Sequence, residues 1–449
     1  MKKYIAAIIV LAVSSLGAHA EFSVATFNVD ITAPMGHALM GGGIAPADQV
    51  IDSLFAKGCV LLGAEKPIVF LALDWCEVRN DAYDRWRSEI SAAAGTQPDH
   101  VLMSCIHQHD TPIADLEAQR LLDEHGLKGA LVFTDYHEDC VQRVASAVRE
   151  ALPNAVPITH YGYGEGETHE LASNRRVEMP DGVNYNRTSA TADAAMRDRP
   201  AGDNDPMVKS ISFWNGDTPV VAMYAFSIHP MSYYGRGDVS ADFVGMARTR
   251  MHAEHPETFQ IYFSGCSGDT IAGKWNDGNP KNRQVLADKL YAGMNTALES
   301  TAREPLDAVR VNVAKIMIPA RDTGDYAPEV LKSTLADPSR KTFDRILAAM
   351  GLSWQSRVAS GQPVDFPAVD FGKAIYLLMP AESFVGWQLR AQAIRPDRLV
   401  FVAGYGECAP GYIPTPRAIE EGFIQAHDWC WVNPDVAEIM ETALAEALK

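Results

Sequence analysis

Short apolar runs alternate with amphipathic segments along most of the chain. The runs that predict strands are residues 68–73, 101–106, 220–226, 260–263, 375–379 and 399–403. The segments with helical periodicity are residues 82–94, 138–152, 242–253, 283–300, 341–360 and 434–448. This alternation predicts an α/β fold in which mixed central sheets are flanked by helices.

Three local features refine this picture. Residues 161–205 are rich in Gly, Asn and Asp and have few apolar runs, which predicts a long excursion over the surface. Residues 320–361 are mostly helical in pattern and polar, which predicts an inserted cap or arm. Ser240 or Asp242 is expected to cap the third helix, and Asn433 the last one.

Side chains suited to chemistry follow five of the predicted strands. In chain order they are His107 with His109, His229, Asp269, Glu382, and Tyr405 with the more distant Tyr412. Ligands of open α/β sheets bind outside the carboxyl ends of the strands. The sequence therefore predicts one shared site, built at the C-terminal ends of several strands.

The histidines indicate a metal at this site. His107 and His109 lie two residues apart and would share a face in an extended chain. Both could bind one ion, or one could bind it while the other contacts the substrate. His229 ends a second apolar strand, and catalytic zinc usually takes about three protein ligands and keeps one open position.

Two carboxylates admit two interpretations each. Glu382 could complete the ligand set, or it could be an acidic residue favoured by the dipole of a helix start. Asp242 could orient a metal ligand from behind, or it could simply cap a helix.

The Ser264–Gly268 turn suggests a nucleophile, but it does not fit the G-x-S-x-G pattern because Asp269 stands two residues after Ser267. Cys266 in that turn is read either as a reactive thiol or as part of a tight glycine turn. The seven cysteines form no C-x-x-C pair, so a structural zinc cluster is not expected. We expect Cys105 and Cys266 to lie near the site, with their pairing open.

The N-terminal residues and the net charge of the chain narrow the class of protein. Residues 1–20 resemble a secretory signal, with Lys2 and Lys3 followed by an apolar run and by Ala18-His19-Ala20. We expect export to the periplasm or medium and a mature chain of residues 21–449, without a transmembrane anchor after cleavage. The net charge of -18 argues against nucleic acid as a partner.

Several motifs, taken in this order, resemble the neutral (non-lysosomal) ceramidase family. The segments that carry the resemblance are residues 29–34 and 40–42 (D-I-T-x-P and M-x-G-Y in the family), 104–110 (H-T-H-S-G-P-G-G), 174–176 (N-R-S), 226–229 with 239–245 (the second zinc-histidine region and S-x-D-N-x-G), 263–269 (F-x-x-x-x-G-D), 379–382 (M-P-G-E) and 411–415 (G-Y-V-T-T). They span most of the mature chain, which would be one ceramidase-like catalytic domain.

The resemblance implies a zinc amidase that cleaves the N-acyl bond of ceramide or of a related N-acyl lipid. Carried over by position, its zinc ligands are His107, His229, Glu382 and Tyr412. The candidate catalytic residues are His109 beside the metal, Arg175 in the substrate pocket and Asp269 in the G-D turn. The expected partner is a small lipid or amide substrate.

One departure keeps other functions open. Ile271 stands where the family motif carries an active-site Ser. Two alternatives therefore accompany the amidase: a zinc hydrolase of another bond class, such as an ester, and a non-catalytic exported binding protein on the same fold.

Overall fold

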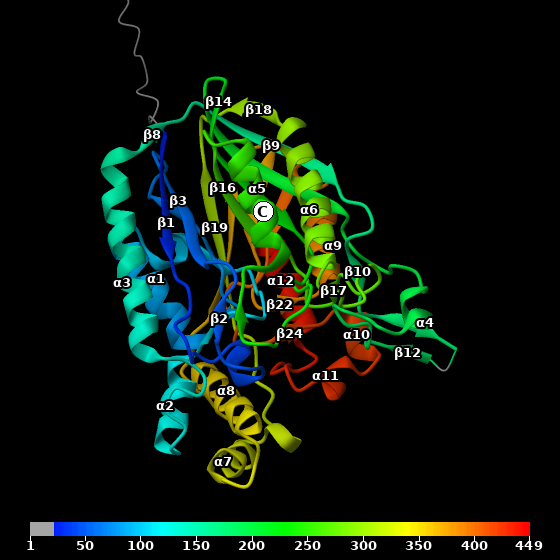
Figure 1. Ribbon diagram of the computed structural model, residues 1–449. Helices are drawn as coiled ribbons and strands as arrows, with labels where there is room; N and C mark the ends of the chain where they lie inside the picture. The colour runs from blue at the N-terminus through cyan, green and yellow to red at the C-terminus, as the bar shows by residue number, and fades with distance from the viewer. Residues whose placement is uncertain (1–21, 181) are drawn as a thin grey trace, which may run out of the picture.

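The computed structural model describes residues 22–180 and 182–449, so the predicted signal at residues 1–20 lies outside the described residues. Three mixed sheets form the body of the protein (Figure 1). The first has the order β6 (Val101–Cys105), β4 (Ile68–Leu73), β3 (Phe55–Leu62), β1 (Ser23–Asp30) and β8 (Val156–Pro157). The second is β16 (Phe259–Ser264), β14 (Thr218–Phe226), β13 (Met207–Asn215), β9 (His160–Glu167) and β18 (Ala302–Pro305). The third is β19 (Arg310–Ile316), β20 (Val364–Asp370), β21 (Ala374–Leu378) and β23 (Leu399–Ala403).

The three sheets repeat one topology. In each, three antiparallel strands are followed by a helix, a fourth strand that pairs in parallel with the third, and a second helix packed on the first strand. We call these units one, two and three. Their first helices are α1 (Asn80–Ala94), α5 (Asp242–Glu254) and α9 (Val385–Ile394), and their second helices are α3 (Thr134–Ala151), α6 (Asn282–Glu299) and α12 (Val436–Ala447).

Aromatic side chains join the units at the centre. The ring of Tyr376 on β21 lies 4.9 Å from that of Phe70 on β4 and 5.5 Å from that of Phe263 on β16, measured between centroids. All three residues are fully buried. Because each ring comes from the parallel pair of a different unit, the carboxyl ends of the three parallel pairs are held around one axis.

Short strand pairs tie together the loops at these carboxyl ends. They are β2 (Gln49–Val50) with β15 (Asp238–Val239), β5 (Glu77–Val78) with β7 (Ile113–Ala114), β10 (Ser173–Asn174) with β17 (Thr270–Ile271), and β22 (Glu382–Ser383) with β24 (Tyr412–Ile413). The small helices α10 (Pro416–Glu420) and α11 (Phe423–Ala426) follow the last pair. The site therefore rests on paired backbone rather than on open loops.

The predicted α/β class is confirmed, and each of the six predicted strands and six predicted helices has a counterpart within one helical turn. The predicted cap by Ser240 or Asp242 is wrong, because Ala241 stands at the N-cap of α5 and makes no side-chain cap hydrogen bond. The Oγ of Ser240, one residue earlier, accepts a hydrogen bond from the backbone N–H of Asp242 (3.0 Å). The predicted cap at Asn433 is wrong. Its amide donates to the carbonyl of Ala320, and α12 begins only at Val436.

The predicted excursion over residues 161–205 is wrong in its first part, because β9 is an inner strand of the second sheet. Glycines at 162, 164 and 166 replace the apolar residues that would mark a buried strand. A Cβ on Gly164 would lie 2.1 Å from the carbonyl oxygen of Ala297, and one on Gly166 2.1 Å from that of Gly293. These glycines let α6 lie directly on β9, and so they hide the strand from a hydrophobicity pattern.

Replacing Gly164 by alanine should therefore destabilise the protein. The new methyl group would meet helix backbone, which cannot rotate away, so β9 and α6 must separate. Overpacking of this kind costs about 1–3 kcal/mol. Denaturant unfolding checks this, with Gly216→Ala as a control for the loss of a glycine, since a Cβ there meets open space although its φ is positive. Equal stability of the wild type and G164A would contradict the argument.

Within the rest of the 161–205 segment, β10 is buried beside β17, whereas the hairpin of β11 (Val177–Met179) with β12 (Gly182–Asn184) and the short α4 (Ala194–Arg197) extend outward (Figure 1). Residues 320–361 are helical as predicted, with α7 (Pro328–Ala336) and α8 (Thr342–Ala359) packed beside α2 (Leu116–Glu124) at one end of the molecule. Whether they act as a cap stays a prediction.

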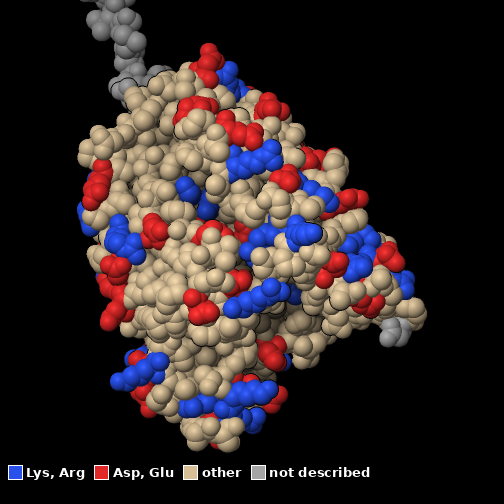
Figure 2. All heavy atoms as spheres, in the orientation of Figure 1, with Lys and Arg blue, Asp and Glu red and all other residues tan. Residues whose placement is uncertain are grey.

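The surface mixes both signs of charge. On the face shown in Figure 2, acidic and basic side chains are interspersed rather than gathered in one patch. Among the described residues, no helix has the length and apolar character needed to cross a membrane.

Candidate metal centre

Three side chains from three different sheets meet at the carboxyl ends of the parallel strand pairs. His107 follows β6, His229 follows β14, and Glu382 follows β21. The Nε2 atoms of the two histidines lie 3.2 Å apart. The Oε2 of Glu382 lies 3.3 Å from the first and 3.1 Å from the second. All three residues are buried, so the structure brings together three of the four predicted ligands at one point.

The hydrogen bonds behind the two imidazoles decide which atoms face this point. The Nδ1 of His107 lies 2.9 Å from the carbonyl oxygen of Cys76, and that of His229 2.5 Å from the carbonyl oxygen of Ser267. A carbonyl only accepts, so each Nδ1 carries the proton and each Nε2 turns a lone pair to the centre. Such carbonyl partners are typical of metal-bound histidines.

The spacing fits a metal ion. Two lone pairs and a carboxylate oxygen that face one another within 3.3 Å repel unless a cation lies between them. Tetrahedral ligands at zinc–nitrogen distances of 2.0–2.1 Å are separated by about 3.3 Å. The Oε2 of Glu382 has no hydrogen-bond donor among the described residues. The group could therefore bind a metal.

The pKa values indicate the same need for positive charge. Burial alone would raise the pKa of Glu382, yet His107 and His229 hold it well below its usual range. Burial lowers and the Glu382 carboxylate raises the pKa of His107, with a net increase. For His229, burial and the nearby Arg175 lower the pKa to about 4. The cluster therefore favours a positive charge at its centre, but it does not favour protonation of His229.

Tyr412 lies beside these three residues. It pairs directly with Glu382 across β22 and β24. Both residues line one cavity, which we call the metal cavity. Burial raises the pKa of its phenol far above the usual value, despite the nearby Arg175. Its predicted role as the fourth ligand stays a proposal.

His109 and Arg175 flank the centre. The ring of His109 stands edge-on to those of His107 and His229, at centroid distances of 5.2 and 5.7 Å. The Nη2 of Arg175 lies 3.3 Å from the Nε2 of His229, and its Nε is buried without a partner among the described residues. Both residues line the cavity, and their predicted catalytic roles stay a proposal.

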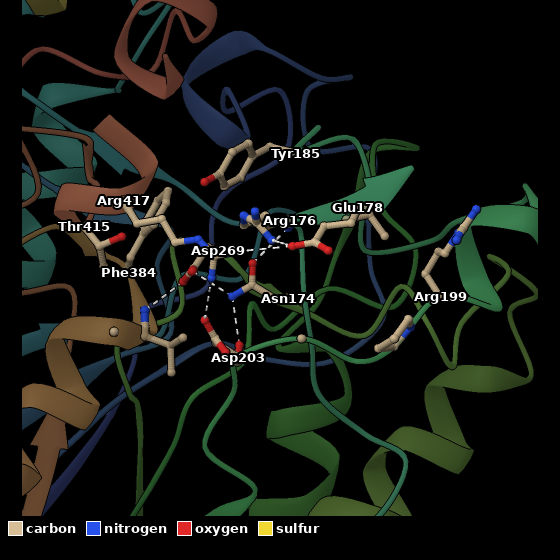
Figure 3. Close-up of a pocket in the computed structure, with 15 residues that line it drawn as sticks. Asn174, Arg176, Glu178, Tyr185, Arg199, Asp203, Asp269, Phe384, Thr415 and Arg417 are labelled. Carbon is tan, nitrogen blue, oxygen red and sulfur yellow. Dashed lines mark hydrogen bonds and ion pairs between the residues drawn. The ribbon is translucent and has the colours of Figure 1, made fainter. Parts of the chain in front are cut away.

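Asp269 lies differently from expectation. Its Oδ2 accepts from the Asn174 side chain (2.8 Å), and its Oδ1 from the N–H of Val385 at the start of α9 (2.7 Å). The carboxylate thus faces a second cavity of about 420 Å³ (Figure 3). Its backbone carbonyl accepts from the N–H of Arg175 (2.7 Å), so Asp269 fixes the segment that carries Arg175 rather than facing the metal ligands.

The segment 174–176 separates the two cavities. Asn174 and Arg176 line the second cavity, whereas Arg175 lines the metal cavity. This alternation follows from the period of two in extended chain. Ile271, where a Ser was expected from the family motif, is fully buried in β17.

Tyr405 and Ser267 support the two histidines, in roles that the sequence does not indicate. The ring of Tyr405 stacks on that of His107, with centroids 4.3 Å apart and planes at 20°. Its hydroxyl lies 2.7 Å from the Oγ of Ser267, whose carbonyl holds His229. Tyr405 therefore connects the two histidines, because it stacks on His107 and contacts the residue whose carbonyl holds His229. Tyr405 follows an apolar strand run, but nothing in the sequence indicates which aromatic faces His107.

The structure also bears on the two interpretations given above for each of Asp242 and Cys266. Asp242 bonds the backbone of Ser232 and the side chain of Arg283, and so holds the loop that follows His229. Cys266 is fully buried and lines neither cavity, which favours a tight turn over a reactive thiol. A Cβ on Gly268 would lie 2.2 Å from the carbonyl oxygen of Glu382, so this turn must be glycine. All seven cysteines are free thiols.

The metal cavity has a volume of about 280 Å³ and apolar walls. Residues from four separate segments form these walls: Met40, Met231, Tyr234, Phe343 and Trp429. The indole N–H of Trp429 donates to Glu77 (3.0 Å), which fixes one wall to β5. A polar group of side chains at the end of an apolar pocket suits a ligand with a polar group attached to a hydrocarbon part.

Comparison with known proteins gives structural matches only. No family profile and no curated protein matches the sequence. A structure described as ceramidase complexed with C2 superposes with a TM-score of 0.67 at 16% identity, covering 96% of this chain and 75% of that one. A neutral ceramidase from Pseudomonas aeruginosa superposes with a TM-score of 0.65 at 15% identity, covering 96% and 74%. The chain therefore has the fold of the neutral ceramidases, as its sequence motifs indicate.

Proposed function

We propose that this protein is a zinc-dependent hydrolase that cleaves the amide bond of an N-acyl lipid, in the manner of a ceramidase. The observation that carries the proposal is the convergence of two imidazole lone pairs and the Glu382 carboxylate in a buried, apolar-walled cavity. The fold shared with the ceramidases supports it.

His107, His229, Glu382 and Tyr412 are the proposed zinc ligands. Neutral imidazole and carboxylate are the usual donors of catalytic zinc. When bound, zinc acts as a Lewis acid that polarises a carbonyl and makes water a stronger nucleophile.

The side chains around the ligands have separate tasks in this proposal. Arg175 has no carboxylate partner among the described residues, so its charge is free to stabilise the negative oxygen that develops during acyl transfer. Burial and the neighbouring His107 keep the pKa of His109 well below its usual value, so His109 is neutral and able to accept a proton. Asp269 is a positioning residue, because it acts through the backbone of Arg175.

Substrate hydrolysis tests the proposal. The purified protein with zinc is offered a short-chain N-acyl sphingosine, an ester of the same acyl chain and a phosphoester. We expect release of fatty acid from the amide, and loss of that activity on dialysis against chelator. Hydrolysis of the ester alone would favour the ester hydrolase. Bound zinc without turnover of any substrate would favour the binding protein.

Zinc should also stabilise the fold. A ligand that binds only the folded state stabilises it by about 2.7 kcal/mol at a hundred times its dissociation constant. The three donor residues belong to three sheets. Without a cation these residues repel one another, and this repulsion opposes the packing of the three units together. We expect the thermal midpoint to fall by several degrees on chelation and to return with zinc but not with magnesium. An unchanged midpoint would contradict a metal at this point.

The exported location remains part of the proposal and rests on the signal-like residues 1–20, with residues 21–449 as one catalytic domain. Sequencing the N-terminus of protein recovered from the periplasm or medium would test both.

A further inference from the structure

The three units place equivalent residues around the metal centre, and one of them is a cysteine. Within each unit, the third strand ends and the chain then delivers a side chain to the centre. After β14 this residue is His229, and after β21 it is Glu382. After β4, the position three residues beyond the strand end is Cys76, just as His229 lies three residues beyond the end of β14. Glu382 lies four residues beyond the end of β21. Cys76 in unit one therefore has the same offset as the candidate ligand of unit two and is one residue closer to its strand than that of unit three.

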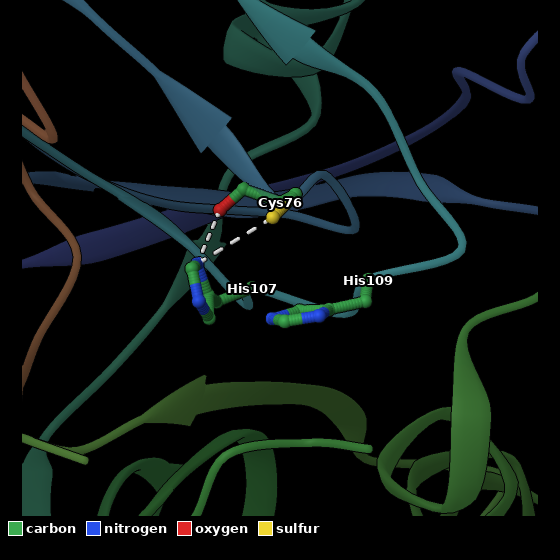
Figure 4. A group of neighbouring side chains, drawn as sticks. All are labelled: Cys76, His107 and His109. Carbon is green, nitrogen blue, oxygen red and sulfur yellow. Dashed lines mark hydrogen bonds between the residues drawn. The ribbon is translucent and has the colours of Figure 1, made fainter. Parts of the chain in front are cut away.

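The thiol of Cys76 lies at the cavity that this equivalence predicts. Its Sγ is 3.7 Å from the Nδ1 of His107 (Figure 4), and Cys76 is the one cysteine among the described residues that lines the metal cavity. The residue is 1% exposed. Its N–H donates to the carbonyl of Pro112 (2.9 Å) and its carbonyl accepts from His107, so the backbone of Cys76 is fixed on both sides.

His109 supplies a second uncommitted donor beside this thiol. Unlike His107 and His229, it has no carbonyl behind its ring, and its Nδ1 is buried without a hydrogen-bond partner among the described residues. One ligand atom each from Cys76, His107 and His109 lies within 4.8 Å of the others. His109 lines the cavity next to Cys76, on the side of Tyr234.

We propose that Cys76 and His109 form a second metal-binding position, next to the candidate zinc centre, that takes a thiophilic cation such as Cd²⁺ or excess Zn²⁺. A thiolate and an imidazole favour soft and borderline ions, whereas the carboxylate and phenol of the first set favour harder ones. Binding forms a metal–sulfur bond, and the thiol proton passes to solvent. With two protein ligands and water for the rest, this position binds more weakly than the first.

Occupation of this position has a functional consequence. His109 bound to a cation no longer accepts a proton, and the ion fills part of the cavity of about 280 Å³. Excess thiophilic metal therefore inhibits the enzyme. This consequence rests on the proposed function, whereas the binding itself does not.

A cadmium titration of the zinc-loaded protein tests the binding. We expect the wild type to take up one further equivalent of cadmium, counted by elemental analysis after gel filtration, together with the ultraviolet charge-transfer band of a cadmium–thiolate bond. Cys76→Ala should lose both the band and the further equivalent. Cys140→Ala removes a buried thiol on α3, away from the cavity, and should keep both.

A second variant and a second readout keep the outcomes separate. His109→Phe should weaken the further equivalent while the zinc content stays at one. Inhibition by cadmium, taken relative to each variant's own activity, should be present in the wild type and C140A and lost in C76A. A wild type without the thiolate band, or a band that persists in C76A, would overturn the second position. A wild type with the band but no amidase activity would overturn the proposed function alone.

Discussion

Replacing Glu382 by glutamine should remove the metal and lower amide hydrolysis by about a thousandfold. Among the described residues, this carboxylate is the one negative group within 3.3 Å of both imidazole Nε2 atoms, and it is buried. Glutamine keeps its size but presents a neutral oxygen or an N–H that competes for the lone pairs. Metal-ion Lewis acidity is worth several kcal/mol in a transition state, and each 1.36 kcal/mol is tenfold in rate, which gives about three orders of magnitude.

The measurement combines zinc content with kcat/KM. Glu407→Gln is the matched control, because Glu407 is also a buried carboxylate but bonds the backbone of Asn80 and Ala409 instead of the cluster. It should keep its zinc whatever it does to stability. Full zinc content in E382Q would place the metal elsewhere, and full activity in a zinc-free E382Q would remove the metal from the reaction.

The strands that position the site were predictable because they are buried on both faces. Runs such as residues 68–73 and 399–403 are continuously apolar, and their bounds agree with β4 and β23. Polar residues directly after such runs stand out, which is why His107, His229 and Glu382 could be named. The inner strand β9 was missed for the opposite reason, since its glycines serve close packing against α6 and leave no hydrophobic signal.

The threefold arrangement of the units could not be predicted. Their strands share an order but no sequence pattern, because the three sheets pack different residues against their helices. The backbone conformation of the turns at the strand ends could not be predicted either. His107 and Tyr405 both have positive φ (73° and 56°), a conformation that non-glycine residues adopt rarely. In an extended chain His107 and His109 would share a face, but the backbone turns at His107 and the two rings instead meet edge to face. Only the assembled sheets bring Cys76 beside His107 and His109.

Replacing Arg175 by methionine should lower kcat/KM by about a hundredfold or more while the zinc content is kept. The guanidinium reaches the centre from the position just after β10, with its Nη2 3.3 Å from the Nε2 of His229, and among the described residues its Nε is left without a partner. A buried cation beside a metal site is unfavourable in the resting protein. It becomes favourable when negative charge develops on the substrate oxygen, and loss of one such donor costs about 10²–10³ in rate.

The neighbouring arginine provides the control. Arg176 faces the second cavity and bonds Glu421 with its guanidinium (2.7 and 2.8 Å), so Arg176→Met should retain most of the activity. Because methionine at 175 also removes a positive charge next to the ligands, zinc affinity should stay equal or rise in R175M. If kcat/KM falls because zinc is lost, Arg175 would instead have a structural role in holding the metal centre together. A fall in kcat/KM with full zinc, present in R175M and absent in R176M, would assign Arg175 to the reaction. The two side chains leave the same extended segment toward opposite cavities, and of the two it is Arg175 that faces the metal ligands.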